Sequence, residues 1–297
     1  MASWFYNLFV SFLFVACLPV LPLLFLAGER YRRGFLQRVG FYPRAVLDAV
    51  RGSRPVWIHA VSVGEVLSLR RLAEEIKGRF PGRKILLSTF TATGNEIARQ
   101  SGAGDAVIFL PLDHPWIVRR ALRLFDPSLV VILETEIWPN FLLLAHESGI
   151  PTLLLSGRLS PGAFRGYSFF GFFFSGVVRR FTAAGMQSED DAERMVELGF
   201  DPQRISITGS LKHALEEGRK EENERFQGAS SAIHRDDGRQ VLVAGSTHRG
   251  EEEVLLEVFL LLKASFPNLL MVLAPRHPQR FYEVERLLKQ KKVAYEK

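Results

Sequence analysis

Glutamate residues follow two strand-like runs in this 297-residue chain. Glu65 comes after the apolar run 55–61 and a turn of small residues. Glu134 and Glu136 come directly after the apolar run 129–133. Ligands of open α/β sheets bind at the carboxyl ends of the strands, where a carboxylate that is desolvated by its substrate can act as a general base. The alternative is that these glutamates only cap the helices that follow them.

The spacing of Glu134 and Glu136 predicts that they differ in role. At the mouth of the parallel sheet, we expect the two carboxylates to point to opposite sides if the backbone is still extended. We therefore expect only one of them to face the ligand.

Residues suited to an anion follow two later strand-like runs. Lys212 follows the run 205–208 and has the length to reach a ligand, although a lone lysine is more often a solvated surface charge. Ser246 and His248 lie between an apolar run and a helical pattern, where free N–H groups at a helix N-terminus suit a phosphate. The alternative there is a plain turn with Thr247 as the N-cap.

A last candidate follows the strand-like run 269–274. Pro275 and Arg276 come next, and the arginine can pair bidentately with a phosphate. The alternative is a surface arginine beside a turn proline.

Short β-branched runs alternate with amphipathic segments from Pro55 onward, which predicts βαβ units and a parallel sheet with helices on both faces. The expected strands are 55–61, 84–90, 106–110, 129–133, 151–155, 183–186 and 205–208. The expected helices include 66–80, 115–125, 141–148 and 190–198.

The charged segment 214–239 predicts an exposed linker between the domain at 29–213 and a second one at 240–297. The pattern restarts with expected strands at 240–244 and 269–274 and expected helices at 251–266 and 279–291. Two strands and two helices are too few to cover both faces of a parallel sheet, so we expect an incomplete second Rossmann-like domain.

The N-terminal segment 1–28 has no charged side chain, and its apolar stretch is long enough to cross a bilayer as a helix. Arginines follow it, which predicts an uncleaved single-pass anchor with the body on the cytoplasmic side. Trp4 and Tyr6 are expected at the opposite interface. The aromatic run 164–174 has two interpretations, a surface that dips into the membrane or rings that pack between domains.

Composition bounds the partners. The net charge of +6 favours an anionic partner, such as a membrane surface, a phosphorylated lipid or a nucleotide, and with the anchor we do not expect nucleic acid. The single cysteine, Cys17, lies in the expected anchor, so neither a disulfide nor a cysteine metal site is possible.

The motifs HAVSVGE, ILETEIWPN, TGSLKH, AGSTHRGEE and APRHP occur in this order behind the expected anchor. In order and spacing the chain resembles the 3-deoxy-D-manno-octulosonic acid (Kdo) transferases, GT-B glycosyltransferases of lipopolysaccharide biosynthesis. The resemblance extends from the anchor to about Arg280, and ETEIWPN and SVGE are its most specific elements.

The resemblance implies transfer of Kdo from CMP-Kdo to lipid IVA at the inner membrane, without a cofactor or metal. It implies that Glu65 is the catalytic base, that Glu134 and Lys212 stabilise the transition state, and that Pro275 and Arg276 contact CMP. Family members continue past this point, so the activity of a chain of this length is an open question. Two alternatives remain: a GT-B transferase that uses another nucleotide sugar, and a membrane-tethered remnant that binds lipid without catalysis.

Overall fold

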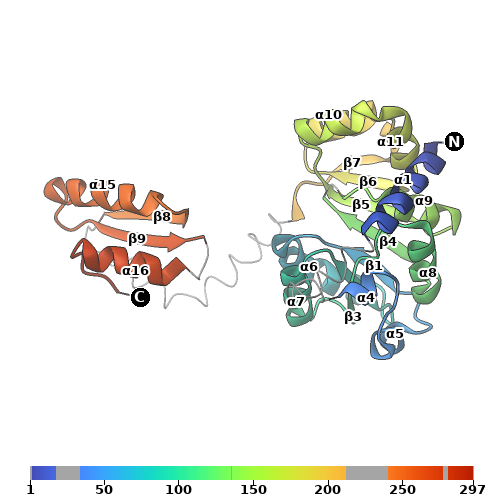
Figure 1. Cartoon of the computed structure of the whole chain (residues 1–297), viewed down its shortest axis with the longest axis horizontal. Helices are drawn as coiled ribbons and strands as arrows, with labels where there is room; N and C mark the ends of the chain where they lie inside the picture. The colour runs from blue at the N-terminus through green and yellow to red at the C-terminus, as the bar shows by residue number, and fades with distance from the viewer. Residues whose placement is uncertain (1, 18–33, 135, 212–239, 277–279, 297) are drawn as a thin grey trace. The chain divides into compact units, whose positions relative to one another are not determined.

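The computed structural model describes residues 2–17, 34–134, 136–211, 240–276 and 280–296 (Figure 1). The chain divides into two compact units, Met1–Gly218 and Arg219–Lys297. The expected linker at 214–239 lies outside the described residues. Each unit is an α/β structure, which confirms the predicted class.

The first unit contains one seven-stranded sheet in the order β3-β2-β1-β4-β5-β6-β7, with every neighbouring pair parallel. Its strands are β1 (Val56–His59), β2 (Ile85–Thr89), β3 (Ala106–Phe109), β4 (Leu129–Leu133), β5 (Thr152–Gly157), β6 (Ala183–Met186) and β7 (Ile205–Ile207). All seven lie within or beside the runs predicted from the sequence. This order is that of a doubly wound Rossmann-type sheet extended by one strand.

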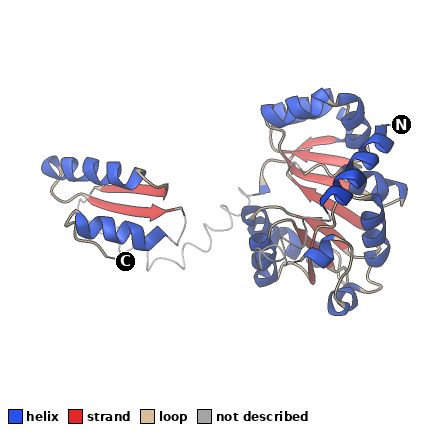
Figure 2. Cartoon of the chain, viewed as in Figure 1, coloured by secondary structure: helices blue, strands red, loops and turns tan. Residues whose placement is uncertain are grey.

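The helices of the first unit include the four predicted ones, found as α6, α8, α9 and α12. The described helices are α1 (Ala2–Cys17), α4 (Phe35–Arg38), α5 (Arg44–Val50), α6 (Val63–Arg79), α7 (Ala92–Ser101), α8 (Pro115–Phe125), α9 (Pro139–Glu147), α10 (Pro161–Phe169), α11 (Gly171–Val178) and α12 (Glu189–Glu197), with a 3-10 turn η2 (Pro202–Arg204). Figure 2 shows these helices flanking the strands.

Two hydrophobic layers cover the two faces of the sheet. All four residues of β1 are therefore buried. Val56 and Ile58 pack with α6 and α7 on one face. Trp57 points to the other face, where its ring meets Phe125 of α8 at 5.6 Å and Phe141 of α9 at 5.1 Å, both edge to face. Helices therefore hold the sheet from both sides and leave the strand ends free for polar residues.

Helix α1 packs against the body of the first unit through its polar side chains. The Tyr6 hydroxyl donates to Asp113 Oδ2 at 2.8 Å, and Ser11 Oγ lies 3.3 Å from His114 Nε2. The expectation that Tyr6 sits at the far membrane interface is therefore wrong. Across the described residues, no helix combines the length and apolar character needed to span a bilayer, and half of the expected anchor lies outside them.

The second unit consists of β8 (Val241–Thr247), α15 (Glu251–Ser265), β9 (Leu270–Pro275) and α16 (Phe281–Gln290) in its described part. Its two strands are parallel. These elements match the predicted restart of the pattern. Several large apolar side chains of α15, including Val254 and Leu261, are exposed.

The aromatic run 164–174 forms α10 and α11 and divides between core and surface. Phe164 and Phe173 pack against the hydrophobic core, and the Phe173 ring lies 5.2 Å from the ring of Tyr6. Phe169 and Phe172 are instead 81% and 79% exposed. The inward rings thus pack within the first unit, and the membrane-dipping interpretation of the exposed rings stays a prediction.

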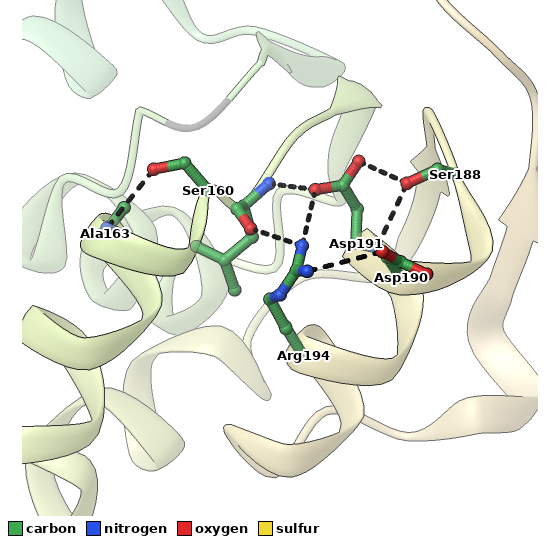
Figure 3. A network of polar contacts seen from close by, with 7 residues as sticks. Ser160, Ala163, Ser188, Asp190, Asp191 and Arg194 are labelled. Carbon is green, nitrogen blue, oxygen red and sulfur yellow. Dashed lines mark hydrogen bonds and ion pairs between the residues drawn. The ribbon is translucent and has the colours of Figure 1, made fainter.

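A buried carboxylate fixes the connection that leads from β5 into α10 (Figure 3). Asp191 Oδ1, in the first turn of α12, accepts the N–H of Leu159 at 2.8 Å. Arg194 Nη1 donates to the carbonyl of the same Leu159 at 3.1 Å. Ser188 caps α12 and donates to Asp191 Oδ2 at 2.6 Å. Both backbone groups of Leu159 are thus satisfied from α12, which sets where α10 begins.

We expect Asp191→Ala to lower the free energy of unfolding by about 1–3 kcal/mol, because it leaves the buried Leu159 N–H without an acceptor. Asp190→Ala is the matched control. It removes only a 3.5 Å ion pair with Arg194 from a side chain that is 77% exposed, so we expect a change below about 0.5 kcal/mol. Urea denaturation of the two variants measures both values. Equal losses would contradict the structural role of Asp191.

Candidate functional site

The strand order reverses between β1 and β4, the central pair of the first sheet. Helices leave these two strands toward opposite faces, α6 toward one and α9 toward the other. The backbone between them is therefore uncovered at the carboxyl edge, which is the ligand-binding position in sheets of this type. Segment 60–65 follows β1, and segment 134–138 follows β4. The candidate site lies where these two segments meet.

Glu65 occupies the third position of α6 and is only 5% exposed. Ser62 is the N-cap and accepts the N–H of Glu65 at 3.2 Å, while Glu65 accepts the N–H groups of Val61 at 2.9 Å and Ser62 at 3.2 Å. The helix-capping alternative for Glu65 is thus confirmed. It does not exclude chemistry, because a carboxylate has about four acceptor positions and these contacts use two. The capping contacts also fix the carboxylate in place.

The expectation of opposite sides has a wrong premise, since side chains two residues apart share one face of an extended strand, and the charge of Glu134 raises the pKa of Glu136. Glu134 has a left-handed backbone with a φ of 55°, and its N–H donates to Leu155 O of β5 at 3.1 Å. This turn ends the extended geometry on which the expected divergence rested. Left-handed backbone is costly outside glycine and is found disproportionately at functional sites.

The pKa of Glu136 is affected by Glu65. Burial raises the pKa of Glu136, and the negative charge of Glu65 raises it further. Trp138 lowers this pKa in part, and Glu134 adds a smaller increase. Three glutamates thus share one electrostatic environment at the junction of β1 and β4. Glu136, which the sequence analysis did not select, shares this environment, and the selection of Glu134 stays a prediction.

Tyr167 of α10 borders the same site. Burial raises its pKa, and the charge of Glu136 adds to the increase. Sequence reasoning missed Tyr167, whose only local signal was its place in the aromatic run. The helix that the Asp191 contacts position therefore contributes a side chain within the electrostatic influence of Glu136.

A second buried carboxylate holds the segment 134–138 at its far end. Pro139 begins α9 and has no N–H, and Asp113 accepts the next two, from Asn140 at 2.9 Å and Phe141 at 2.8 Å. Asn140 Nδ2 in turn donates to the backbone carbonyl of Asp113 at 2.6 Å. Burial raises the pKa of Asp113, and the hydrogen bonds from Asn140, Tyr6 and Phe141 lower it in part.

An aromatic and cationic wall stands beside this segment. The Trp138 ring lies 5.5 Å from the ring of Phe90, and the Arg38 guanidinium stands 5.1 Å from the same Phe90 ring. Arg38 Nη2 also donates to Phe90 O at 2.6 Å. Burial lowers the pKa of Arg38. A positive group held on an aromatic stack is suited to an anionic or sugar ligand.

Lys212 lies outside the described residues, but the residue before it is placed. The N–H of Leu211 donates to Ser156 Oγ at 3.2 Å, at the carboxyl end of β5. Glu134 N–H bonds to Leu155 of the same strand. The chain therefore returns to the candidate site immediately before Lys212.

In the second unit, Ser246 and His248 are not placed as the sequence suggested. Strand β8 continues through Thr247, with an irregularity in pairing where Ser246 has a φ of 59°. The N-cap of α15 is Gly250, so the Thr247 N-cap alternative is wrong. The His248 N–H donates to Glu251 at 2.7 Å, and α15 begins with three glutamates. These acids already complement the helix N-terminus, which weakens the case for a phosphate there.

Pro275 and Arg276 lie beside Ser246 and His248 at the carboxyl edge of the second sheet. Pro275 pairs with Thr247, and the Arg276 N–H donates to Thr247 O at 3.1 Å. The Arg276 side chain is exposed. The four predicted residues of this unit are thus gathered around Thr247.

A buried ion pair that sequence reasoning missed supports this group. Arg280 donates to Glu252 through both terminal nitrogens, at 2.8 and 3.0 Å, and Thr247 Oγ1 donates to Glu252 at 2.9 Å. Burial raises the pKa of Glu252, but the hydrogen bonds from Arg280 and Thr247 outweigh it and hold this pKa below its ordinary value. Arg280 Nη1 also donates to Thr247 O at 3.3 Å, so the pair ties the end of β8 and the start of α15 to the residue before α16.

Comparison with known proteins agrees with this arrangement. A family model described as 3-deoxy-D-manno-octulosonic-acid transferase (kdotransferase) matches residues 33–215. The 3-deoxy-D-manno-octulosonic acid transferase of Haemophilus influenzae is 32% identical over 296 residues, 98% of this chain and 68% of that protein. Its namesake in Bordetella pertussis is 33% identical over 252 residues, 81% of this chain and 56% of that protein. The chain thus spans only part of the length of these relatives.

Solved structures share the architecture at low sequence identity. A UDP-GlcNAc 2-epimerase from Neisseria meningitidis matches with a TM-score of 0.52 and 14% identity, over 79% of this chain and 70% of that one. A UDP-N-acetylglucosamine 2-epimerase from Rickettsia bellii matches with a TM-score of 0.51 and 12% identity, over 80% of this chain and 66% of that one. They support a GT-B-like fold of Rossmann-type units and nothing beyond the fold. With the family model matched over residues 33–215, the chain belongs to the 3-deoxy-D-manno-octulosonic acid transferases, a family of glycosyltransferases.

Proposed function

We propose that this chain acts as an inverting glycosyltransferase that moves Kdo from CMP-Kdo to lipid IVA, the bis-phosphorylated precursor of lipid A. Family membership supports the transfer of Kdo. The observation that carries the proposal for these residues is the meeting of Glu65 with the segment of Glu134 and Glu136 where the strand order reverses. The identities of the donor and the acceptor and the inverting stereochemistry go beyond family membership and are proposed here.

Glu65 is the proposed general base. A hydroxyl oxygen of the acceptor sugar attacks the anomeric carbon of Kdo, the bond from that carbon to the CMP phosphate oxygen breaks, and the hydroxyl proton passes to Glu65. The capping contacts with Val61 and Ser62 keep the carboxylate from rotating away, so that it is already oriented when the acceptor binds.

Other residues stabilise the charge that develops as CMP leaves. Glu134 faces the sugar, whose anomeric carbon becomes positive, and Lys212 balances the departing phosphate. In the second unit, Pro275 and Arg276 contact CMP, with Ser246 and His248 beside them. The hydrogen bonds around Thr247, which gather these four residues at one sheet edge, support this assignment. The proposed chemistry requires neither a metal nor an organic cofactor.

Glu136 has a role that the resemblance did not assign. Its raised pKa means that it keeps its proton to a higher pH than an ordinary glutamate does. A protonated Glu136 removes one negative charge beside Glu65 and can donate a hydrogen bond to the sugar. We therefore include Glu136 among the residues that contact substrate.

The proposed place of action is the cytoplasmic face of the inner membrane, with residues 1–28 as the attachment. A single membrane span within these residues stays a prediction. The exposed apolar side chains of α1, including Phe5, Phe9 and Phe12, support attachment, as do Phe169 and Phe172. The net charge of +6 suits an anionic leaflet and a phosphorylated acceptor.

We expect Glu65→Gln to lower the rate of Kdo transfer by about 10²–10⁴-fold, the usual contribution of a general base. Glutamine can still accept the Ser62 N–H, so the fold and the binding of CMP should be retained. Glu75→Gln, on the exposed side of α6, is the control and should leave the rate unchanged. Turnover with radiolabelled Kdo measures the rate, and calorimetry measures CMP binding. Undiminished transfer by Glu65→Gln would exclude this residue as the base.

The coupling between Glu136 and Glu65 has its own test. Because Glu65 raises the pKa of Glu136, Glu65→Gln should lower that pKa, whereas Glu75→Gln should not. A carbon-13 NMR titration of the glutamate carboxyls measures it. In the wild type, the folded protein holds this proton more tightly than the unfolded chain does. Stability should therefore fall as the pH rises from the ordinary pKa toward the raised one, and Glu136→Gln should remove that fall. An unchanged Glu136 pKa in Glu65→Gln would separate the two residues.

Membrane attachment is tested with Phe169→Ser and Phe172→Ser combined. Each ring is expected to bury apolar surface in the interface, so the pair should weaken binding to anionic vesicles by about tenfold or more. Phe80→Ser, an exposed phenylalanine at the end of α6, is the matched control. Vesicle sedimentation of the full chain measures binding. Equal binding by all three proteins would show that α10 and α11 do not touch the membrane.

A further inference from the structure

An apolar groove of about 370 Å³ lies between α1, α4 and the start of α8. Phe14 of α1 forms one wall, Phe35 and Val39 at the two ends of α4 form another, and Phe41 and Trp116 complete it. Its size falls within the range of small-ligand pockets, about 300–1,000 Å³. None of the roles proposed above uses it.

The walls are mostly apolar. Among the described residues that line the groove, His114 and the indole N–H of Trp116 are the polar side-chain groups, and both ring nitrogens of His114 are engaged. Nδ1 accepts the backbone N–H of Trp116 at 3.3 Å, and Nε2 lies 3.3 Å from Ser11 Oγ. Burial lowers the pKa of His114 and so disfavours a charged ring. A sugar or phosphate inside the groove would lose most of its hydrogen bonds to water without replacement, whereas a hydrocarbon chain would not.

Two arginines adjoin residues that line the groove: Arg120 contacts Phe41, and Arg38 is the chain neighbour of Val39. The Arg120 guanidinium lies 5.0 Å from the Phe41 ring, and its Nε donates to Gly40 O at 2.8 Å. Arg38 precedes Val39, and its guanidinium lies 4.5 Å from the Phe109 ring. An apolar groove whose lining residues adjoin arginines complements a molecule that has a hydrocarbon tail and an anionic head.

Contacts link the lining of the groove to the candidate site. Val39 lines the groove, and its chain neighbour Arg38 contacts the Phe90 ring, which lies 5.5 Å from the ring of Trp138 in the segment that carries Glu134 and Glu136. On the other side, His114 follows Asp113, which holds the start of α9.

We propose that this groove binds one acyl chain of the lipid acceptor, and that Arg38 and Arg120 face the acceptor's anionic head. The proposal rests on the proposed function for the identity of the lipid. The groove itself rests on the contacts of α1, α4 and α8. It makes the tail of the acceptor a determinant of specificity, because a deacylated acceptor would lose this subsite while keeping its contacts with the glutamates.

Trp116 provides a direct probe of the groove, since it lines it and is 55% exposed. Dibromostearate below its micelle concentration should quench Trp116 fluorescence in the full chain carrying Trp4→Phe, because bromine quenches only at contact. The quenching should disappear in Trp116→Phe, which keeps an aromatic wall. Val39→Phe narrows the groove and should weaken the binding of dibromostearate by about tenfold. Val196→Phe on α12, which adds the same ring elsewhere, should not.

A kinetic arm separates the groove from the proposed function. Val39→Phe should raise KM for tetra-acylated lipid IVA by about tenfold, with kcat unchanged, and leave the use of the deacylated disaccharide bisphosphate unaltered. If wild-type protein transfers no Kdo, the proposed function fails, and the fluorescence arm still decides the groove. If transfer proceeds but Trp116 is not quenched, or Val39→Phe and Val196→Phe behave alike, the groove proposal is overturned. If Val39→Phe does not fold, Phe41→Ala takes its place. This variant removes part of the wall of the groove and should weaken the binding of the fatty acid.

Discussion

The reversal of strand order between β1 and β4 determines where this molecule can act. A parallel sheet needs helices on both faces, and the two directions of winding must meet at one pair of strands. At that pair, the helices that follow diverge and leave backbone at the carboxyl edge uncovered. Glu65 follows one of these strands, and Glu134 and Glu136 follow the other. The hydrophobic layers around Trp57 keep the two strands in register and so keep the glutamates together.

Buried carboxylates that accept backbone N–H groups recur along this edge. Glu65 accepts from the turn before α6, Asp113 accepts from the start of α9, and Asp191 accepts from the start of the connection to α10. In the second unit, Glu252 instead accepts side-chain donors, the Arg280 guanidinium and the Thr247 hydroxyl. Each satisfies donors that would otherwise be orphaned at a helix or strand end, so loops at a ligand-binding edge become rigid. That rigidity lets a carboxylate near its substrate stay oriented before binding.

Much of the architecture was predictable because burial leaves a period in the sequence. The β-branched runs located all seven strands of the first sheet, and helical periodicity located α8 at its observed ends. Long-range partners leave no such trace. Tyr6 has the composition of an interface anchor, yet it bonds to Asp113, which lies 107 residues away. No local pattern predicts that contact.

The candidate site was predictable in part for a similar reason. Residue type and strand ends pointed to Glu65 and to the pair Glu134 and Glu136. Which member of the pair faces Glu65 depends on the left-handed turn at Glu134, a conformation that side chains other than glycine seldom adopt. Around Ser246, small residues resembled a turn, but a pairing irregularity lets β8 continue to Thr247. Backbone geometry decided both cases.

The most direct test of the account is a crystal structure of the chain with the phosphorylated disaccharide head of the acceptor. The account predicts a sugar hydroxyl oxygen about 2.6–3.2 Å from a Glu65 carboxylate oxygen, with Glu136 on the same sugar and the contacts to Val61 and Ser62 retained. A disaccharide bound away from the junction of β1 and β4, with Glu65 bonded only to its own helix cap, would contradict it.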